Sequence, residues 1–403
     1  MPPRFDRTRQ APDRKARVCV VTTSRSDFGL LHPLIREIDG RGSLELNVLA
    51  TGTHFARGAG DTWREIEAEG VPLHFKVDMG IGSDDPQDLA HAVGRGVGGL
   101  ADALSVCDPD LVVVMGDRFE LLALLSATTL LRIPVAHISG GEVTEGAMDD
   151  QIRHATTKCS HLHYVANEIF AARLLRMGEE PWRVVVTGEP GLDTVLSVEA
   201  VPRETLEKEL GLSFETPTAL IAYHPVTQEP HLLTRHLREI VAALEAAMES
   251  RGLQLLITEP NADPGRDEIV AGFRDLARRY PGAVVLRKSL GHRRFVTAMQ
   301  HCRVMIGNSS SGLVEAPSWN LPAVNIGSRQ AGRPEADTVV SCAPERESIL
   351  RAMDRAMERK GPPPVNPFGQ GGASARIAEH VASTLRTSHR DALLRKRFID
   401  SHH

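Results

Sequence analysis

The stretch SGGEVTEGAMDDQIRH, residues 139–154, places four carboxylates, an arginine and a histidine within sixteen residues. It follows the short apolar run IPVAHI (133–138), which is typical of a buried strand. A carboxylate beside a guanidinium can move a proton on a substrate while the cation binds an anionic group. The segment is therefore a candidate site for acid–base chemistry on an anionic ligand.

Two pairs of residues carry this hypothesis. Asp117 and Arg118 follow the apolar run DLVVVMG, and Asp149 and Arg153 are four residues apart, which places them on one face of a helix. A surface ion pair between Asp149 and Arg153 is the structural alternative. If carboxylates from two strand ends meet, each shifts the pKa of the other, which separates an acid from a base.

A second candidate is an anion site in GNSSSGLVEAPS, residues 307–318. Ser309, Ser310 and Gly312 come where a strand turns into a helix, so backbone N–H groups, hydroxyls and the helix dipole would point at a phosphate. Glu315, one turn later, could accept hydrogen bonds from a ribose diol. The pattern predicts a nucleotide site.

Two other kinds of site are not favoured. No Walker-type loop with lysine is present, and GRGVGG (94–99) falls inside a helical pattern. His154, Cys159, His161 and His163 look like metal ligands, but their spacing matches no zinc motif, so we expect no metal.

Apolar strands separated by helices must position these residues. Strand-like runs are expected at 16–24, 44–52, 110–117, 133–141, 218–225, 253–261, 283–289, 302–310 and 322–328. Such alternation predicts parallel sheets covered on both faces, with ligands at the carboxyl ends of the strands. We expect an α/β protein of two Rossmann-like, doubly wound domains that face a cleft.

The predicted organisation has four parts. A disordered tail (1–15) precedes an N-terminal Rossmann-like domain (16–195) and a C-terminal, nucleotide-binding domain (196–370). A C-terminal helix (371–403) is expected to pack back on the N-terminal domain.

Composition excludes several classes of protein. The 403 residues, 41% of them hydrophobic, suffice for two cores. A net charge of −5 without a basic stripe argues against a nucleic-acid partner, and the apolar runs are too short to span a membrane. Five widely spaced cysteines fit reduced thiols in the cytoplasm.

Seven segments follow one another along the chain: TSRSDFGLL, MGDRFE, GGEVTEGAMDDQIRHATTKCSHLHY, YHPVT, PNAD, GNSSSGLVEAPS and NIGSRQAGR. Taken in this order, they resemble the hydrolysing UDP-N-acetylglucosamine 2-epimerases of sialic-acid and related nonulosonic-acid biosynthesis. The similarity runs from about Arg17 to Ser374.

The resemblance implies a two-domain fold of the GT-B type and a UDP- or GDP-linked 2-acetamido sugar as substrate. It implies elimination of the nucleoside diphosphate with loss of the C2 proton, giving a glycal intermediate. Hydration then releases the free 2-epimer, an N-acetylmannosamine-type sugar. No metal or redox cofactor is implied, and a homodimer is expected.

Residue roles follow from the matched positions. The residues expected to be catalytic are Asp117, Glu142, Asp149 and His224. Those expected to bind the substrate or its nucleotide are Arg25, Arg118, Ser139, Arg153, Asn261, Ser309, Ser310, Gly312, Glu315 and Arg329. Ser139 departs from the pattern, because relatives carry glutamate or histidine there, so the second proton carrier and the exact sugar stay open.

Three alternatives share these motifs. A non-hydrolysing 2-epimerase would return the nucleotide to the sugar, and a GT-B glycosyltransferase would need an acceptor alcohol. A nucleotide-sugar-binding regulator would bind without turnover, an alternative raised by Ser139 alone.

Overall fold

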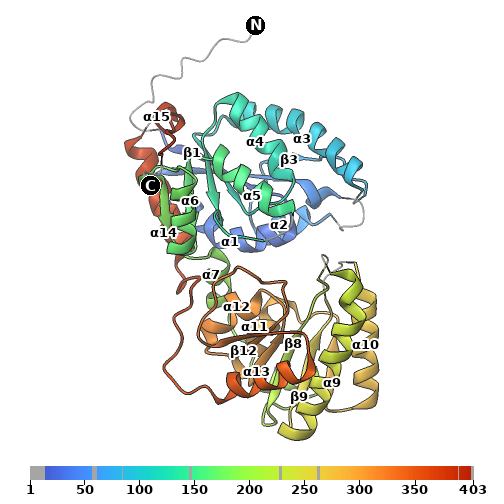
Figure 1. The fold of residues 1–403 in the computed structure, drawn as a ribbon. Coiled ribbons are helices and arrows are strands. Elements are labelled where there is room, and N and C mark those ends of the chain that lie inside the picture. The colour runs from blue at the N-terminus through green and yellow to red at the C-terminus, as the bar shows by residue number, and fades with distance from the viewer. Residues whose placement is uncertain are drawn as a thin grey trace. The chain divides into compact units, whose positions relative to one another are not determined.

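The structure, a computed structural model, describes residues 14–56, 61–83, 85–144, 148–226, 229–260, 264–388 and 390–400. Two compact units divide the chain (Figure 1): Met1–Glu142, Ala147–Thr194 and Gly371–His403 form the first, and Val195–Gln370 with Val143–Gly146 form the second. Most of the predicted N-terminal tail, residues 1–13, lies outside the described residues. Each unit is built on its own parallel sheet.

Seven parallel strands form the sheet of the first unit, among the residues that the structure describes. They are β1 (Ala16–Thr22), β2 (Leu44–Thr51), β3 (Phe75–Val77), β4 (Leu111–Met115), β5 (Val135–Ile138), β6 (Leu162–Val165) and β7 (Val184–Val186). Their order is β3-β2-β1-β4-β5-β6-β7, so the direction of winding reverses between β1 and β4. In such sheets the crevice for ligands lies at the carboxyl ends, near that reversal.

Helices cover both faces of this sheet. They are α1 (Arg25–Asp39), α2 (Trp63–Ala68), α3 (Pro86–Cys107), α4 (Glu120–Leu131), α5 (Met148–Cys159), α6 (Glu168–Arg176), α14 (Ala373–Thr387) and α15 (Arg390–Leu394), with the 3-10 turns η1 (Gly52–Phe55) and η2 (Pro181–Arg183). On β1, Val18 and Val20 join the core under α1 and α14, whereas Cys19 and Val21 join the core under α3 and α4. Because successive side chains of a strand alternate, β1 is buried on both faces.

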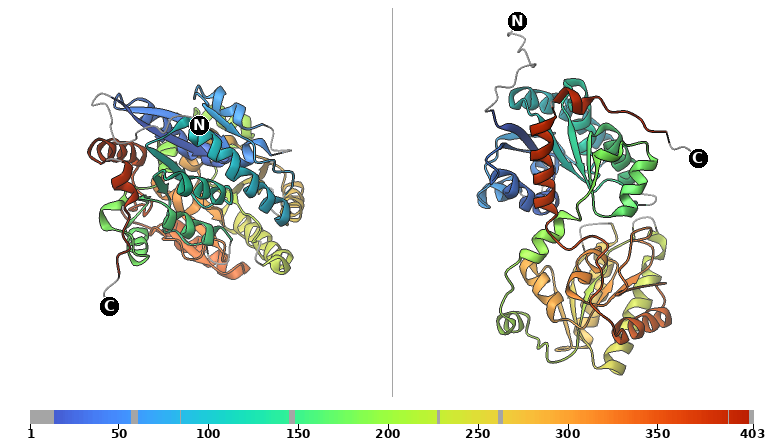
Figure 2. Two further views of the ribbon diagram at one scale, coloured as in Figure 1. Left: turned by 90° about the horizontal axis from the view of Figure 1, so that it is seen from above. Right: turned by 90° about the vertical axis from the view of Figure 1, so that its left-hand side faces the viewer.

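The C-terminal helix α14 belongs to the first unit, where it contacts α1 and β1. Figure 2 shows it in red beside the blue strand β1. Asp193, in α7 (Pro190–Ser197), caps it: its carboxylate accepts the N–H groups of Ala373 at 3.1 Å and Ser374 at 2.6 Å. The cap satisfies N–H groups that the first turn of a helix leaves unpaired.

The second unit holds six parallel strands in the order β10-β9-β8-β11-β12-β13 among its described residues. These are β8 (Thr218–Ala222), β9 (Gln254–Thr258), β10 (Val284–Arg287), β11 (Val304–Gly307), β12 (Ala323–Ile326) and β13 (Val339–Cys342). The helices are α8 (Arg203–Leu210), α9 (Leu233–Arg251), α10 (Arg266–Arg279), α11 (Gly291–His301), α12 (Ser311–Val314) and α13 (Arg346–Glu358), with η3 (Pro230–Leu232) and η4 (Ala316–Trp319). Two parallel sheets confirm the predicted α/β fold.

Local signals fix the ends of the helices. The Ser24 hydroxyl accepts the N–H of Asp27 to begin α1, and Asp85 caps α3 just before Pro86. GRGVGG lies inside α3, as predicted. A Cβ on Gly96 would approach the Met79 side chain to 2.7 Å, so this glycine serves close packing.

Among the residues that the structure describes, every helix is too short or too polar to span a lipid bilayer.

Candidate functional site

The carboxyl ends of β4 and β5 lie side by side in the first sheet. The N–H of Gly116, directly after β4, donates to the carbonyl of Ile138, the last residue of β5, at 3.0 Å. Gly116 and Ser139 both have positive φ, 79° and 62°. Each strand therefore turns sharply at its end, and the turns present Asp117 and Ser139 at the same edge of the sheet.

Arg153 joins that edge from α5. Its guanidinium donates to the Asp117 carboxylate and lies 3.7 Å from Asp150. The Arg153 side chain is only 4% exposed, so the alternative of a surface ion pair is wrong. A buried guanidinium needs an anionic partner to offset its lost hydration, and Asp117 supplies one from a different strand end.

Asp149 lies one helical turn before Arg153 on α5, as the spacing predicts. Partial desolvation raises the pKa of Asp149, and the Asp117 carboxylate raises it further. Arg153 and Arg118 act in the opposite direction. The two aspartates thus differ in environment: Asp117 is ion-paired, whereas Asp149 holds a proton more readily than a solvated aspartate.

Arg118, next to Asp117, contacts residues that follow other strands of the sheet. Its guanidinium lies 3.2 Å from the Glu120 carboxylate and 3.3 Å from the Thr53 hydroxyl. Burial raises the pKa of Glu120, which is fully buried, and also that of Asp27, while Arg118 opposes both shifts. Arg118 is therefore held among carboxylates of raised pKa.

Ser139 and Glu142 follow β5 in the chain, and both are buried. The Ser139 hydroxyl donates to the Glu189 carboxylate at 3.2 Å. Between them, the carbonyl of Gly141 accepts a hydrogen bond from Arg173. The turn is thus fixed by charged groups from the segments that follow β6 and β7.

Arg25 is placed differently from the other predicted residues of this unit. It is exposed at the first position of α1 and forms an ion pair with Glu65 at 2.8 Å. That contact does not link it to Asp117 or Arg153.

In the second unit, His224 follows β8 and is tied to Asn308, which follows β11. The N–H of His224 donates to Asn308 Oδ1 at 2.7 Å, and Asn308 Nδ2 donates to the His224 carbonyl at 2.8 Å. Arg329 donates to the Asn308 carbonyl at 3.1 Å. Burial and the nearby Arg329 lower the pKa of His224 to about 4, so the imidazole is neutral at pH 7.

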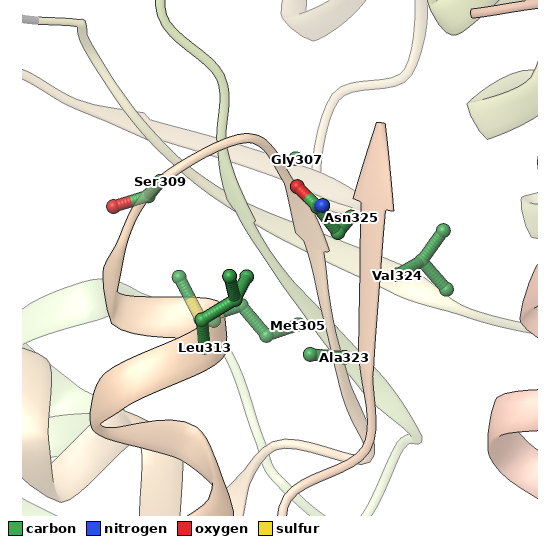
Figure 3. A pocket seen from close by; sticks show the side chains of 8 residues that line it. Met305, Gly307, Ser309, Leu313, Ala323, Val324 and Asn325 are labelled. Atoms are coloured by element: carbon green, nitrogen blue, oxygen red, sulfur yellow. The ribbon is translucent and has the colours of Figure 1, made fainter. Parts of the chain in front are cut away.

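Ser309 and Ser310 lie between β11 and α12, and Gly312 is the second residue of α12, a helix of one turn. Beneath them is a cavity of about 10 Å³, near the size that one water needs. Figure 3 shows Met305 and Leu313 in the interior of this region and Ser309 and Asn325 near the strand ends. The cavity is too small for a nucleotide.

Glu315 follows α12. Burial raises its pKa to about 7, although a hydrogen bond with Ser311 opposes the shift. Asn261, the remaining predicted residue, lies outside the described residues.

Sequence reasoning missed several residues that lie near Asp117 and Arg153 in the first unit or near His224 in the second. Asp27 and Glu120 stand in the segments TSRSDFGLL and MGDRFE, and their acidic type was the available signal. Asn308 and His137 gave no comparable signal, since an asparagine after a strand and a histidine within one usually satisfy backbone groups.

The histidines that resemble metal ligands have other partners. His154 faces Asp150 at 3.4 Å, His163 lies 2.9 Å from Glu179, and His161 accepts the N–H of Val135 at 3.2 Å. Within the described parts of the chain, no group of three potential ligands converges.

Comparison with known proteins identifies the family of the chain. The sequence profile of the family described as "UDP-N-acetylglucosamine 2-epimerase" matches residues 36–382. A relative from Campylobacter jejuni, "GDP/UDP-N,N'-diacetylbacillosamine 2-epimerase (hydrolyzing)", is 32% identical over 86% of this chain and 87% of its own. The "UDP-N,N'-diacetylbacillosamine 2-epimerase (hydrolyzing)" of Legionella pneumophila is 32% identical over 89% and 94%.

Solved structures show the same fold. The UDP-GlcNAc 2-epimerase of Neisseria meningitidis, bound to UDP-GlcNAc, superposes with a TM-score of 0.75 at 20% identity and covers 91% of this chain and 100% of its own. That of Methanocaldococcus jannaschii gives 0.74 at 18% identity, with 91% and 99% covered. The profile match extends over most of the chain, and it shows that the protein belongs to the UDP-N-acetylglucosamine 2-epimerase family, the nucleotide-sugar 2-epimerases.

Proposed function

We propose that this protein is a hydrolysing 2-epimerase that converts a nucleoside-diphosphate 2-acetamido sugar to the free 2-epimer. The observation that carries the proposal is that two aspartates, Asp117 and Asp149, interact with each other and with the buried Arg153. Two relatives that are named hydrolysing 2-epimerases match this chain over 86% and 89% of its length, which supports the hydrolysing branch.

The first unit would supply the proton chemistry. One carboxylate takes the C2 proton while the bond from C1 to the diphosphate oxygen breaks, which leaves a C1–C2 double bond. Water then adds at C1, and a proton returns to C2 from the opposite face. Asp117, ion-paired with Arg153, suits the role of base, whereas the raised pKa of Asp149 suits an acid.

Cations near these carboxylates would stabilise the charge that develops on the leaving diphosphate. Arg118 and Arg153 already lie among the acidic groups, and Arg25 is an exposed third cation of the same unit. Glu142, buried behind β5, would bind the sugar or assist the return of the proton.

The second unit would bind the nucleotide. The Ser309 and Ser310 hydroxyls would donate to phosphate. The N–H of Gly312 donates to the carbonyl of Ser309 at 3.1 Å, so Gly312 would serve by keeping the turn beside the phosphate small. Glu315 would accept hydrogen bonds from the ribose. His224 is neutral at pH 7, so it would donate a hydrogen bond to the diphosphate rather than act as a strong acid. Arg329 and Asn261 complete the proposed set.

The relatives named above favour a 2,4-diacetamido sugar, because both act by name on N,N'-diacetylbacillosamine nucleotides. UDP-GlcNAc is the second candidate, since the 30% identical relative from Neisseria meningitidis is named a UDP-N-acetylglucosamine 2-epimerase. Because Ser139 stands where relatives carry glutamate or histidine, an experiment must decide between the two substrates.

The test is a proton NMR time course in deuterated water with UDP-GlcNAc, UDP-diacetylbacillosamine and their GDP counterparts. We expect a free 2-epimer carrying deuterium at C2, with one nucleoside diphosphate released per sugar. Deuterium exchange with an epimer that keeps its nucleotide would show a non-hydrolysing enzyme. Product formation only with an acceptor alcohol would show a glycosyltransferase, and saturable binding without turnover would show a regulator.

We also propose a homodimer formed through α4. On this helix Leu122 and Leu130 are 37% and 79% exposed, beside the exposed Ser126 and Thr129, and Val106 on the adjacent α3 is 78% exposed. Exposed apolar side chains that lie together are typical of an interaction surface. Sedimentation equilibrium should give the dimer mass, and Leu122→Glu with Leu130→Glu should give a monomer; a wild-type monomer at micromolar concentration would contradict the proposal.

A further inference from the structure

His137, on β5, is fully buried and makes two hydrogen bonds through its ring. Nε2 lies 2.8 Å from the carbonyl oxygen of Gly116, and Nδ1 lies 3.2 Å from the hydroxyl oxygen of Thr157 on α5. Gly116 is the residue directly before Asp117. The imidazole therefore joins the strand-end turn that carries Asp117 to the helix that carries Arg153.

The chemistry of the partners fixes the direction of both bonds. A carbonyl oxygen only accepts, so Nε2 must carry the hydrogen. In a neutral imidazole Nδ1 is then an acceptor, and the Thr157 hydroxyl donates to it. Burial lowers the pKa of His137 to about 3, so this neutral tautomer persists across the physiological range.

These bonds close a ring with the ion pair described above. Asp149, Arg153 and Thr157 are spaced by four residues and so occupy one face of α5. Arg153 binds the side chain of Asp117, and Thr157 binds, through His137, the backbone just before Asp117. The position of Asp117 relative to α5 is thus set at two points.

Neighbouring residues leave little freedom in this ring. A Cβ on Gly140 would lie 3.0 Å from both His137 Nδ1 and the Thr157 hydroxyl. Lys396 donates to the carbonyl of Ser160 at 2.7 Å, which fixes the C-terminal end of α5. A side chain at position 140 would therefore press on the hydrogen bond between His137 and Thr157.

We propose that His137 and Thr157 are positioning residues that hold the Asp117 carboxylate in the place where it meets the reacting carbon. The inference rests on the proposed function of Asp117. Neither side chain needs to contact the substrate, since both act through the backbone at Gly116. A displacement of the order of 1 Å in a catalytic group can cost about a hundredfold in rate.

The chain offers a matched pair of threonines to test this. Thr156 and Thr157 are adjacent on α5 and both fully buried, but the Thr156 hydroxyl donates at 2.8 Å to the carbonyl of Ile152 within its own helix. Thr157→Val and Thr156→Val each remove one buried hydroxyl without changing volume much. Only the first breaks the link to His137.

We expect Thr157→Val to lower kcat by about 10- to 100-fold with KM changed less than about threefold, while Thr156→Val stays within about threefold of the wild type. Thr157→Ser, which keeps the hydroxyl, should restore most of the rate. In an Asp117→Asn background, Thr157→Val should add little further loss, because both changes act on one group.

Distinct results would overturn the inference. Thr157→Val with wild-type kcat would refute it, as would equal losses from Thr156→Val and Thr157→Val, which would show a general effect of buried hydroxyl loss on α5. A wild-type chain that turns over no nucleotide sugar would refute the proposed function itself, and the inference with it.

Discussion

His224 and Asn308 exchange two hydrogen bonds across the ends of β8 and β11, at 2.7 Å and 2.8 Å. The asparagine side chain here replaces the backbone partner that a longer strand would provide. The bonds hold His224 against the turn that leads to Ser309. The side-chain amide of Asn308 therefore fixes the backbone N–H and carbonyl of His224, a residue of the proposed nucleotide site.

Replacing Asn308 should destabilise the second unit. Asn308→Ala leaves the N–H and carbonyl of His224 without these partners, and we expect a loss of about 1–3 kcal/mol in unfolding free energy. Asn308→Asp keeps the acceptor for the His224 N–H but places a buried carboxylate oxygen against the His224 carbonyl, so it should cost at least as much as Asn308→Ala. Urea denaturation followed by circular dichroism measures both, and an Asn308→Ala protein as stable as the wild type would contradict this account.

Asp117→Asn should abolish most of the turnover. Loss of a proton-transfer carboxylate typically lowers kcat by about 100- to 10,000-fold. The matched control is Asp150→Asn, because Asp150 also faces Arg153 but at 3.7 Å, and we expect its rate to stay within about tenfold of the wild type. Steady-state kinetics of nucleoside diphosphate release compares them; equal losses in the two variants would show that pairing with Arg153, and not proton transfer, is what matters.

Binding of UDP should strengthen as the pH rises through 7. Burial raises the pKa of Glu315 to about 7 in the ligand-free protein, so at lower pH the carboxyl is protonated and loses acceptor capacity for the ribose hydroxyls. Each pH unit below that pKa should weaken binding by up to about tenfold. Calorimetric titration from pH 5.5 to 8 measures the dependence.

Glu315→Gln supplies the control for that titration, because the amide does not ionise over this range. The phosphate groups of UDP titrate equally in both experiments, so the ratio of the two dissociation constants isolates Glu315. A ratio that stays constant from pH 5.5 to 8 would show that Glu315 does not bind the ribose in its ionised form.

Much of the fold could be predicted from local pattern. The strands β1, β2, β4 and β5 lie within the predicted runs, because fully buried parallel strands are written as continuous apolar segments. β3, β6, β7 and β13 lie outside the predicted runs. Each contains only three or four residues, too few for an apolar run to stand out, and β3, β7 and β13 are edge strands, where burial on both faces is not required.

By itself, the sequence determined the residue types at the strand ends and the helical spacing of Asp149 and Arg153, since both are properties of a local stretch of chain. Only the tertiary structure decided that Arg153 would be buried against Asp117, and that His137 would bridge Gly116 and Thr157. Partners that come from separate strands and helices meet only when the sheet is assembled. Their pKa shifts and hydrogen bonds depend on that burial, which no local pattern encodes.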